Sequence, residues 1–437
     1  MTLRSWLRLL AALATLAAAA TGLASAQEGG TPPGTCAPDA RQDSGAIYRI
    51  CMPPAERYNG DLVIWAHGYQ AFNEPLGIPE EQLCGVLQGS SICINDLANL
   101  LGFGFATTSY SRTGLAVLEG LADVVDLVDI YTRKHGQPDH VYLVGASEGG
   151  LVTVLGIERY PQVFDGGLAM CGPIGDFNIQ PTYYGDFRVV FDYFFPGLIP
   201  GSATDIPPSL IQGWDSQWEN VILPAVSDPA NARTVRQLLR VTGAPFQRGD
   251  PNTILETIHD ALWYSVFATD DAIAQLGGQP FDNTSRRYRG SGDDADLNDK
   301  VQRVSASPLA LDTIEAFYQT SGELDNPVVT LHTTKDQQVP YEHEILYRRK
   351  VRDTGNRDLL KSFRIRRYGH CSIKTAEALL GFALLVKQVS NQPLEGVNST
   401  LQSASDRQEW IEGVKDLNLP VAESDPAAQR RSPSKRR

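Results

Sequence analysis

The fold is decided by the stretch Val141-Tyr142-Leu143-Val144-Gly145-Ala146-Ser147-Glu148-Gly149-Gly150. Its four apolar residues predict a buried strand, and the pattern over residues 150–160 predicts a helix. Ser147 would then lie on the tight turn between them, where small neighbours let the backbones crowd together. A serine hydroxyl is a poor nucleophile unless such a turn holds it beside a histidine, so the stretch indicates a nucleophilic serine. The alternative is an ordinary glycine-rich turn into a helix.

Two later segments place an acid and a histidine at the ends of predicted strands. Residues 326–332 form an apolar run that leads to Asp336, and residues 363–368 lead to Gly369 and His370. The order of serine, acid and histidine resembles that of the α/β-hydrolase superfamily. The resemblance implies an α/β fold, with a doubly wound, mostly parallel sheet and a large helical lid insertion. It also implies a catalytic triad of Ser147, Asp336 and His370, with Asp176 as the substitute candidate for the acid.

A third strand ends in a His-Gly pair. The apolar residues 61–66 lead to His67, Gly68 and Tyr69, which resembles the oxyanion loop of the same superfamily. The resemblance implies that the backbone N–H groups of Tyr69 and Glu148 face the oxyanion that develops during acyl transfer. We expect His67 to order this loop rather than to act as a base.

The first 26 residues have the pattern of a secretory signal peptide. Arg4 and Arg8 precede an apolar run over residues 9–20, and Ala24-Ser25-Ala26 forms a small-residue cleavage site. We therefore expect cleavage after Ala26 and a secreted or periplasmic protein, with a membrane anchor as the alternative.

Charge and composition limit the kinds of partner. The chain carries a formal net charge of -13, which argues against nucleic acid or another polyanion as a partner. With 42% hydrophobic and 20% charged residues, the composition is that of a large globular enzyme. We expect no membrane contact after signal cleavage and a disordered basic tail over residues 423–437. The oligomeric state stays open.

The cysteines are even in number, which in an exported protein favours disulfides. Proximity in the sequence suggests that Cys36 pairs with Cys51 and Cys84 with Cys93. Cys171 and Cys371 remain, and both would lie at the carboxyl edge of the sheet, where a bond would hold the histidine loop. Tannase-like and feruloyl esterases have a disulfide beside the histidine, but it reaches a cysteine next to the serine, where this chain has Ala146. The likeness is partial, and two buried thiols are the alternative.

The predicted organisation has a core in two parts. Residues 27–171 would form the first part of the hydrolase core and residues 326–422 the second, with a lid and some core elements over residues 172–325. The aromatic residues within 183–195 would either line an acyl or aryl pocket or only pack the lid on the core. Residues 113–135 have the pattern of an amphipathic helix that covers the sheet.

No metal or cofactor is expected. The acidic run 293–299 lacks the glycine of a calcium loop, and Ser305 stands where a bidentate glutamate is needed, so we expect a mobile solvated loop. Five histidines have no zinc-type spacing and are expected to be satisfied or surface residues: His135, His140, His259, His332 and His343.

These patterns together predict an exported serine hydrolase that cleaves a small-molecule or polymeric carboxylic ester through an acyl-enzyme. One alternative is a secreted peptidase of the prolyl oligopeptidase-like type, in which Gly-x-Ser-x-Gly-Gly also occurs. The region before Asp61 is too short for the propeller of those enzymes. The other alternative is a hydrolase-like binding protein without catalysis.

Overall fold

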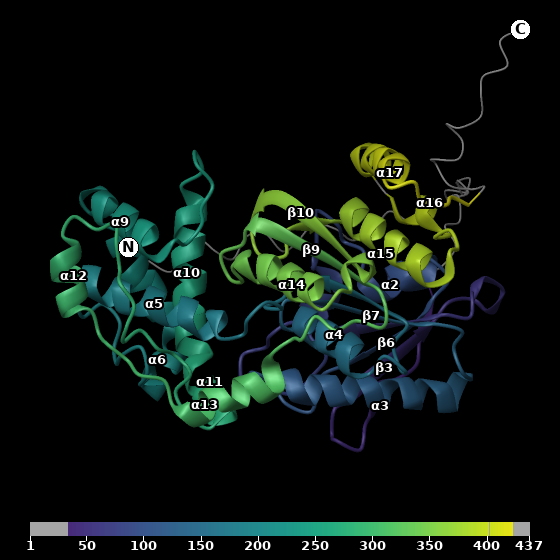
Figure 1. Ribbon diagram of the computed structural model, residues 1–437, viewed down its shortest axis with the longest axis horizontal. Coiled ribbons are helices and arrows are strands. Elements are labelled where there is room, and N and C mark those ends of the chain that lie inside the picture. Colours follow the sequence, from purple (N-terminus) through teal and green to yellow (C-terminus); the bar gives the residue numbers. More distant parts are fainter. Residues whose placement is uncertain (1–33, 402, 423–437) are drawn as a thin grey trace, which may run out of the picture. The chain divides into compact units, whose positions relative to one another are not determined.

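The computed structural model describes residues 34–401 and 403–422, so the expected signal peptide and basic tail lie outside the described residues. A sheet with the strand order β1-β3-β6-β4-β7-β8-β9-β10 forms its centre, and β2 pairs with β3 (Figure 1). The strands are β1 (Thr35–Cys36), β2 (Ala40–Arg41), β3 (Ile47–Met52), β4 (Leu62–Ala66), β6 (Gly104–Thr108), β7 (Val141–Ala146), β8 (Gly166–Met170), β9 (Val328–Lys335) and β10 (Leu360–Tyr368).

Most of this sheet is parallel. The strands from β6 to β10 in the spatial order run parallel to one another, whereas β3 is antiparallel to β6 and pairs in turn with β1 and β2. Parallel strands need crossover connections, and here helices supply them on both faces. Since β7, β8, β9 and β10 are neighbours, their carboxyl ends meet at one edge of the sheet. The fold is thus the doubly wound α/β architecture that the sequence predicts.

Helices cover both faces of the sheet. The alternation along β4 shows the division, because Val63 and Trp65 belong to one apolar cluster, while Leu62 and Ile64 belong to the other. The first cluster is covered by α2 (Ile94–Leu100), α15 (Thr375–Ser390) and α17 (Ala404–Asp416), and the second by α3 (Val117–His135), α4 (Glu148–Arg159), α14 (Glu342–Asp353) and η4 (Ile314–Tyr318).

A third apolar cluster belongs to the helices that follow β8, in the segment predicted as the lid. These helices bury their aromatic and aliphatic side chains against one another, so the segment has a core of its own. The helices that contribute to this cluster are α5 (Ile179–Phe194), α6 (Pro208–Gln212), α7 (Trp214–Gln217), η2 (Trp218–Ile222), α8 (Leu223–Ser227), α9 (Ala232–Thr242), α10 (Asn252–Phe267) and α12 (Asp294–Lys300). The same segment contains η3 (Pro229–Asn231), and α11 (Thr269–Leu276) and α13 (Pro308–Thr313) bury Leu276 and Ala310 in the second cluster.

Short elements complete the described chain. Two of them pair away from the main sheet, where β5 (Leu87–Gln88) lies parallel to β11 (Ile373–Lys374). The others are η1 (Ala55–Arg57), α1 (Glu80–Cys84), η5 (Arg357–Leu359) and α16 (Val397–Thr400). In the part of the chain that the structure describes, no helix is long and apolar enough to cross a bilayer.

Two expectations from the sequence are wrong in detail. The acidic run forms the short helix α12 rather than a loop, because the Asp293 side chain caps the N–H groups of Ala295 and Asp296. The covering helix α3 begins at Val117 rather than at residue 113, because the backbone N–H of Leu115 bonds to the carboxylate of Asp271 instead of entering a helix.

Candidate active site

Ser147 stands on the turn between β7 and α4 with φ 58° and ψ -124°. Few residues other than glycine adopt a positive φ, so the backbone here is strained, as in a nucleophile elbow. Close packing explains why Gly149 follows, since a Cβ at that position would overlap the backbone oxygens of Ala66 and His67. Because Ser147 directly follows β7, it lies at the carboxyl edge of the sheet.

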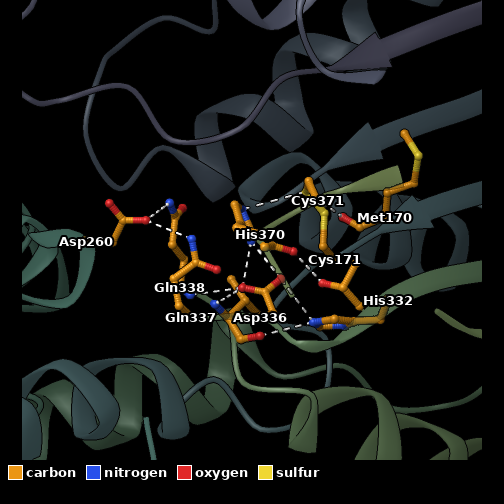
Figure 2. A network of polar contacts seen from close by, with 12 residues as sticks. Met170, Cys171, Asp260, His332, Asp336, Gln337, Gln338, His370 and Cys371 are labelled. Carbon is orange, nitrogen blue, oxygen red and sulfur yellow. Dashed lines mark hydrogen bonds and ion pairs between the residues drawn. A yellow bond between two sulfur atoms is a disulfide. The ribbon is translucent and has the colours of Figure 1, made fainter. Parts of the chain in front are cut away.

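Asp336 and His370 meet at the same edge. Asp336 follows β9 directly, and its Oδ1 accepts hydrogen bonds from the backbone N–H groups of Gln338 (2.9 Å) and Val339 (2.8 Å). Its Oδ2 lies 2.8 Å from His370 Nδ1 (Figure 2). Burial opposes the ionisation of Asp336, but the charge of His370 and the hydrogen bonds from His332 and His370 outweigh it and lower the pKa. An ionised Asp336 therefore fixes the histidine with Nδ1 protonated.

His332 is a second histidine on the acid. It is fully buried, and its Nε2 lies 3.5 Å from Asp336 Oδ2 and 3.1 Å from the carbonyl oxygen of Val339. Burial disfavours its charged form, but the hydrogen bond that His332 donates to Asp336 outweighs this effect and raises the pKa. From the sequence, His332 was expected to be a satisfied or surface histidine. Its place on β9, four residues before Asp336, was the signal available.

The lid segment also holds the acid loop. Asp260 of α10 accepts hydrogen bonds from the side-chain amides of Gln337 (2.9 Å) and Gln338 (2.8 Å), the two residues after the acid (Figure 2). Tyr183 and Tyr184 of α5 donate to the carbonyl oxygens of the same two residues. Sequence reasoning missed Asp260 because contacts between distant segments leave no local pattern.

The histidine loop is held from two sides. Thr333 of β9 donates to the carbonyl oxygen of Gly369 at 2.7 Å, and a disulfide joins Cys371 to Cys171, with the two Cα atoms 5.4 Å apart. The structure also pairs Cys36 with Cys51 and Cys84 with Cys93. Among the described residues, the only group with metal-ligating geometry is Cys171, His370 and Cys371. Its two sulfurs are bonded to each other and so are not thiolate ligands.

Ser147 and His370 are not hydrogen-bonded to each other in the described part of the chain. Both residues nevertheless lie at the carboxyl edge of the sheet. Catalytic hydrogen bonds are often long in the absence of substrate and tighten when it binds. His370 Nε2 faces Cys371, whose Sγ lies 3.7 Å away.

The oxyanion loop is ordered by neighbours on both sides. The His67 ring stacks on Tyr110 with centroids 3.9 Å apart, and its Nδ1 lies 2.7 Å from the carbonyl oxygen of Gly68. Burial lowers the pKa of His67 to about 4, so the ring is neutral and orders the loop by donating through Nδ1. The ring of Tyr69 packs between Trp263 and Tyr264 of α10, and its hydroxyl donates to the carbonyl oxygen of Phe267.

A mostly apolar cavity opens beside the serine. Ser147, Glu148 and Tyr69 contribute to its lining, and so do the aromatic residues Phe177, Tyr184, Tyr264 and Phe281. The rings of Tyr184 and Tyr264 stack with centroids 4.9 Å apart, and both hydroxyls donate to groups of Gln338. Because the hydroxyls are used in this way, the tyrosines present ring faces rather than free donors to the cavity.

Few of the aromatic residues within 183–195 line this cavity. Tyr184 lines it, but Phe187 and Phe191 are fully buried in the lid core, where Phe191 stacks on Phe195. For most of the predicted pocket wall over residues 183–195, the packing alternative therefore holds. The sequence could not separate the two, because both place an aromatic stripe on one helix face.

Glu148 brings a carboxyl group to the cavity beside the serine. Its Oε1 accepts a hydrogen bond from the backbone N–H of Ala116 at 3.1 Å. Burial is the main cause that raises the pKa of Glu148 to about 8, and the charge of nearby Asp271 adds to it. The side chain is therefore neutral at pH 7. A charged Glu148 would oppose an oxyanion at Ser147, and burial removes that charge.

Other residues considered from the sequence lie elsewhere. Asp176 accepts hydrogen bonds from Asn178 and Gln319 and makes none with His370. His343 is buried between Gly175 and Gln180. The remaining histidines bond or pack locally, with His140 on Asp61, His259 on Asp260 and His135 beside the ring of Tyr131.

Comparisons with known proteins give likeness in structure only. No family model matches the sequence. No curated protein matches it either. Feruloyl esterase B from Aspergillus oryzae is similar over 81% of this chain and 79% of its own, with 14% identity and a TM-score of 0.47. An acylaminoacyl peptidase from Pyrococcus horikoshii is similar over 84% of this chain, with 11% identity and a TM-score of 0.41, and this chain spans 44% of its length. An arylesterase is similar over 82% of this chain and 86% of its own, with 12% identity and a TM-score of 0.39.

The arrangement of strands, helices and site residues in this chain identifies its fold. A mostly parallel sheet is wound on both faces, a serine stands at positive φ between β7 and α4, and an acid and a histidine follow β9 and β10 at the same edge. The chain therefore has the α/β-hydrolase fold.

Proposed function

We propose that this protein is a serine hydrolase that cleaves carboxylic esters through an acyl-enzyme. The observation that carries the proposal is the placement of Ser147, at φ 58°, on the sheet edge where Asp336 and His370 pair at 2.8 Å. A strained serine turn beside an ordered imidazole is the arrangement that makes a hydroxyl nucleophilic.

Each member of the triad has one task in this proposal. His370 Nε2 takes the Ser147 proton as Oγ attacks the ester carbonyl carbon, and then gives it to the leaving alcohol. Asp336 stays ionised and stabilises the imidazolium through Nδ1. Water then attacks the acyl-enzyme with the same assistance and releases the acid, which restores the free serine.

The oxyanion is stabilised by backbone donors. The N–H of Glu148 is at the first turn of α4, where helix N–H groups have no partner within the helix. The N–H of Tyr69 would be the second donor. The neutral carboxyl of Glu148 keeps negative charge away from the same place.

The cavity supports an ester with an apolar acyl or aryl group. Its walls are ring faces and aliphatic side chains, which favour apolar groups over charged ones. An acidic chain is also a poor partner for nucleic acid. Three disulfides support a secreted or periplasmic location as part of this proposal.

The test is a panel of ester and peptide substrates with the wild type and with Ser147→Ala. We expect the wild type to hydrolyse apolar esters and to be labelled by a fluorophosphonate, and the variant to do neither. Hydrolysis of peptides in preference to esters would favour the secreted peptidase. An unlabelled wild type without activity would favour a binding protein.

A further inference from the structure

Gln82, a residue of the short helix α1, holds both sides of the oxyanion loop. Its Oε1 accepts a hydrogen bond from the backbone N–H of Gly68 at 2.6 Å, and its Nε2 donates to the carbonyl oxygen of Tyr69 at 3.2 Å. Gly68 lies close to both this side chain and the serine. A Cβ at Gly68 would come within 3.1 Å of both Gln82 Oε1 and Ser147 Cβ.

These bonds determine where the N–H of Tyr69 points. The Gly68–Tyr69 peptide is planar, so its carbonyl oxygen and its N–H point in opposite directions. His67 Nδ1 holds that oxygen, while Gln82 holds the groups on either side of the same peptide. Among the described residues the N–H of Tyr69 has no hydrogen-bond partner. Gly68, the residue before this donor, lies next to Ser147.

Gln82 is itself held by a clasp, by which we mean residues 80–93. The disulfide between Cys84 and Cys93 closes it, and Arg49 binds Glu80 at its start, with 2.7 Å between Nη2 and Oε1. Strand β5 of the clasp pairs with β11, which begins two residues after Cys371. The clasp therefore contacts the oxyanion loop on one side and the end of the histidine loop on the other.

We propose that Gln82 is a positioning residue that orients the Tyr69 N–H toward the oxyanion. The clasp keeps Gln82 in the position that this requires. The inference rests on the proposed function, because an oxyanion donor has meaning only for an acyl-transfer enzyme. Gln82 does not touch the substrate. It acts by keeping a donor at the place where negative charge appears in the transition state, so its loss lowers turnover rather than binding.

Two substitutions at Gln82 test this role, with a matched control. Gln82→Met keeps the length of the side chain and removes both hydrogen bonds. We expect kcat for an apolar ester to fall by about tenfold to a hundredfold, with KM changed less than about twofold. Gln88→Met, at an exposed position on the same clasp, is the control and should leave both constants unchanged. A trifluoromethyl ketone, whose serine adduct carries an oxyanion, should lose affinity in step with kcat/KM.

Gln82→Glu adds a signature that general loosening of the loop would not give. The carboxylate still accepts from Gly68, but when ionised it repels the carbonyl oxygen of Tyr69 instead of donating to it. Its kcat relative to the wild type should therefore rise as pH falls and the carboxyl becomes protonated. This arm remains informative if Gln82→Met fails to fold.

The outcomes separate the two proposals. A folded Gln82→Met with the kcat of the wild type, or a Gln82→Glu variant whose relative kcat is independent of pH, would overturn the role of Gln82 alone. A wild type that no fluorophosphonate labels and that hydrolyses no ester would overturn the proposed function and this inference with it.

Discussion

The sulfur of Cys371 lies 3.7 Å from Nε2 of His370, the ring nitrogen turned away from Asp336. The same sulfur is bonded to Cys171, which follows β8, the strand between those that lead to the serine and the acid. The residue after His370 is thus bonded to the end of β8, at the carboxyl edge of the sheet. If His370 is the base, as proposed, this bond should affect turnover, because proton transfer is sensitive to small displacements of the base.

Loss of this disulfide is expected to lower activity more than stability. In a Cys171→Ala/Cys371→Ala double variant, kcat should fall by about tenfold or more per folded molecule, because the histidine loop loses its tie to β8. The measurement is ester turnover beside the melting temperature. A Cys36→Ala/Cys51→Ala variant, which alters a disulfide far from the histidine in sequence, is the control and should lose stability without a change in turnover. Equal turnover in both double variants would contradict the prediction.

Variants of the triad should fold but not turn over. Ser147→Ala and His370→Ala are expected to lower kcat/KM for an ester by several orders of magnitude, and Asp336→Asn by about 10⁴, because an amide cannot hold the required tautomer of the histidine. Fluorophosphonate labelling should disappear in Ser147→Ala. Asp176→Asn is the control, since that carboxylate bonds to Asn178 and Gln319, and its activity should match the wild type.

The cavity and the lid core should respond differently to the loss of a phenyl ring. Both rings are buried in the lid core, but Phe281 also lines the cavity beside Ser147, whereas Phe191 does not. Phe281→Ala should raise the rate on long acyl esters relative to short ones, because it widens the cavity. Phe191→Ala should cost about 3 to 5 kcal/mol of stability and leave that ratio unchanged. A changed ratio in Phe191→Ala alone would place the acyl group elsewhere.

The raised pKa of Glu148 predicts how the stability of the protein depends on pH. Its pKa is about 8 in the folded chain and 4.5 in its ordinary state, so the folded state binds more protons between these values. Stability must therefore fall as pH rises through this window, by a slope on the order of 1 kcal/mol per pH unit. Glu148→Gln should lack this part of the slope in denaturant titrations at a series of pH values.

The same group should affect turnover. As pH rises through about 8, the wild type gains a negative charge beside the oxyanion and its kcat should decline. Glu148→Gln keeps an acceptor for the N–H of Ala116 and should hold its kcat over the same range. A decline of equal size in both proteins would assign it to another group.

The fold, and the placement of Ser147, Asp336 and His370 at one edge of the sheet, could be predicted because their signals are local. The strand before Gly145, the small residues around Ser147 and the strand ends before Asp336 and His370 are patterns within a few positions. The order of these segments along the chain then limits the topology.

The supports of the site could not be predicted in the same way. Asp260 lies far from Gln338 in the sequence, and the hydrogen bond between Gln82 and Gly68 joins two different segments of the chain. Such contacts depend on tertiary packing, which leaves no periodicity to find. The sequence left the burial of Phe191 as one of two alternatives and did not predict the capping of α12 by Asp293, because a residue type suits more than one environment.

The positive φ of Ser147 also limits which hydroxyl or thiol residue suits this position. Threonine carries the same hydroxyl, but its branched Cβ is a poor fit to a φ of 58°, since β-branched residues rarely adopt a positive φ. Cysteine has an unbranched Cβ and lacks this additional steric conflict. The backbone of this one turn therefore accommodates serine or cysteine and disfavours threonine, whatever the chemistry of the surrounding loops.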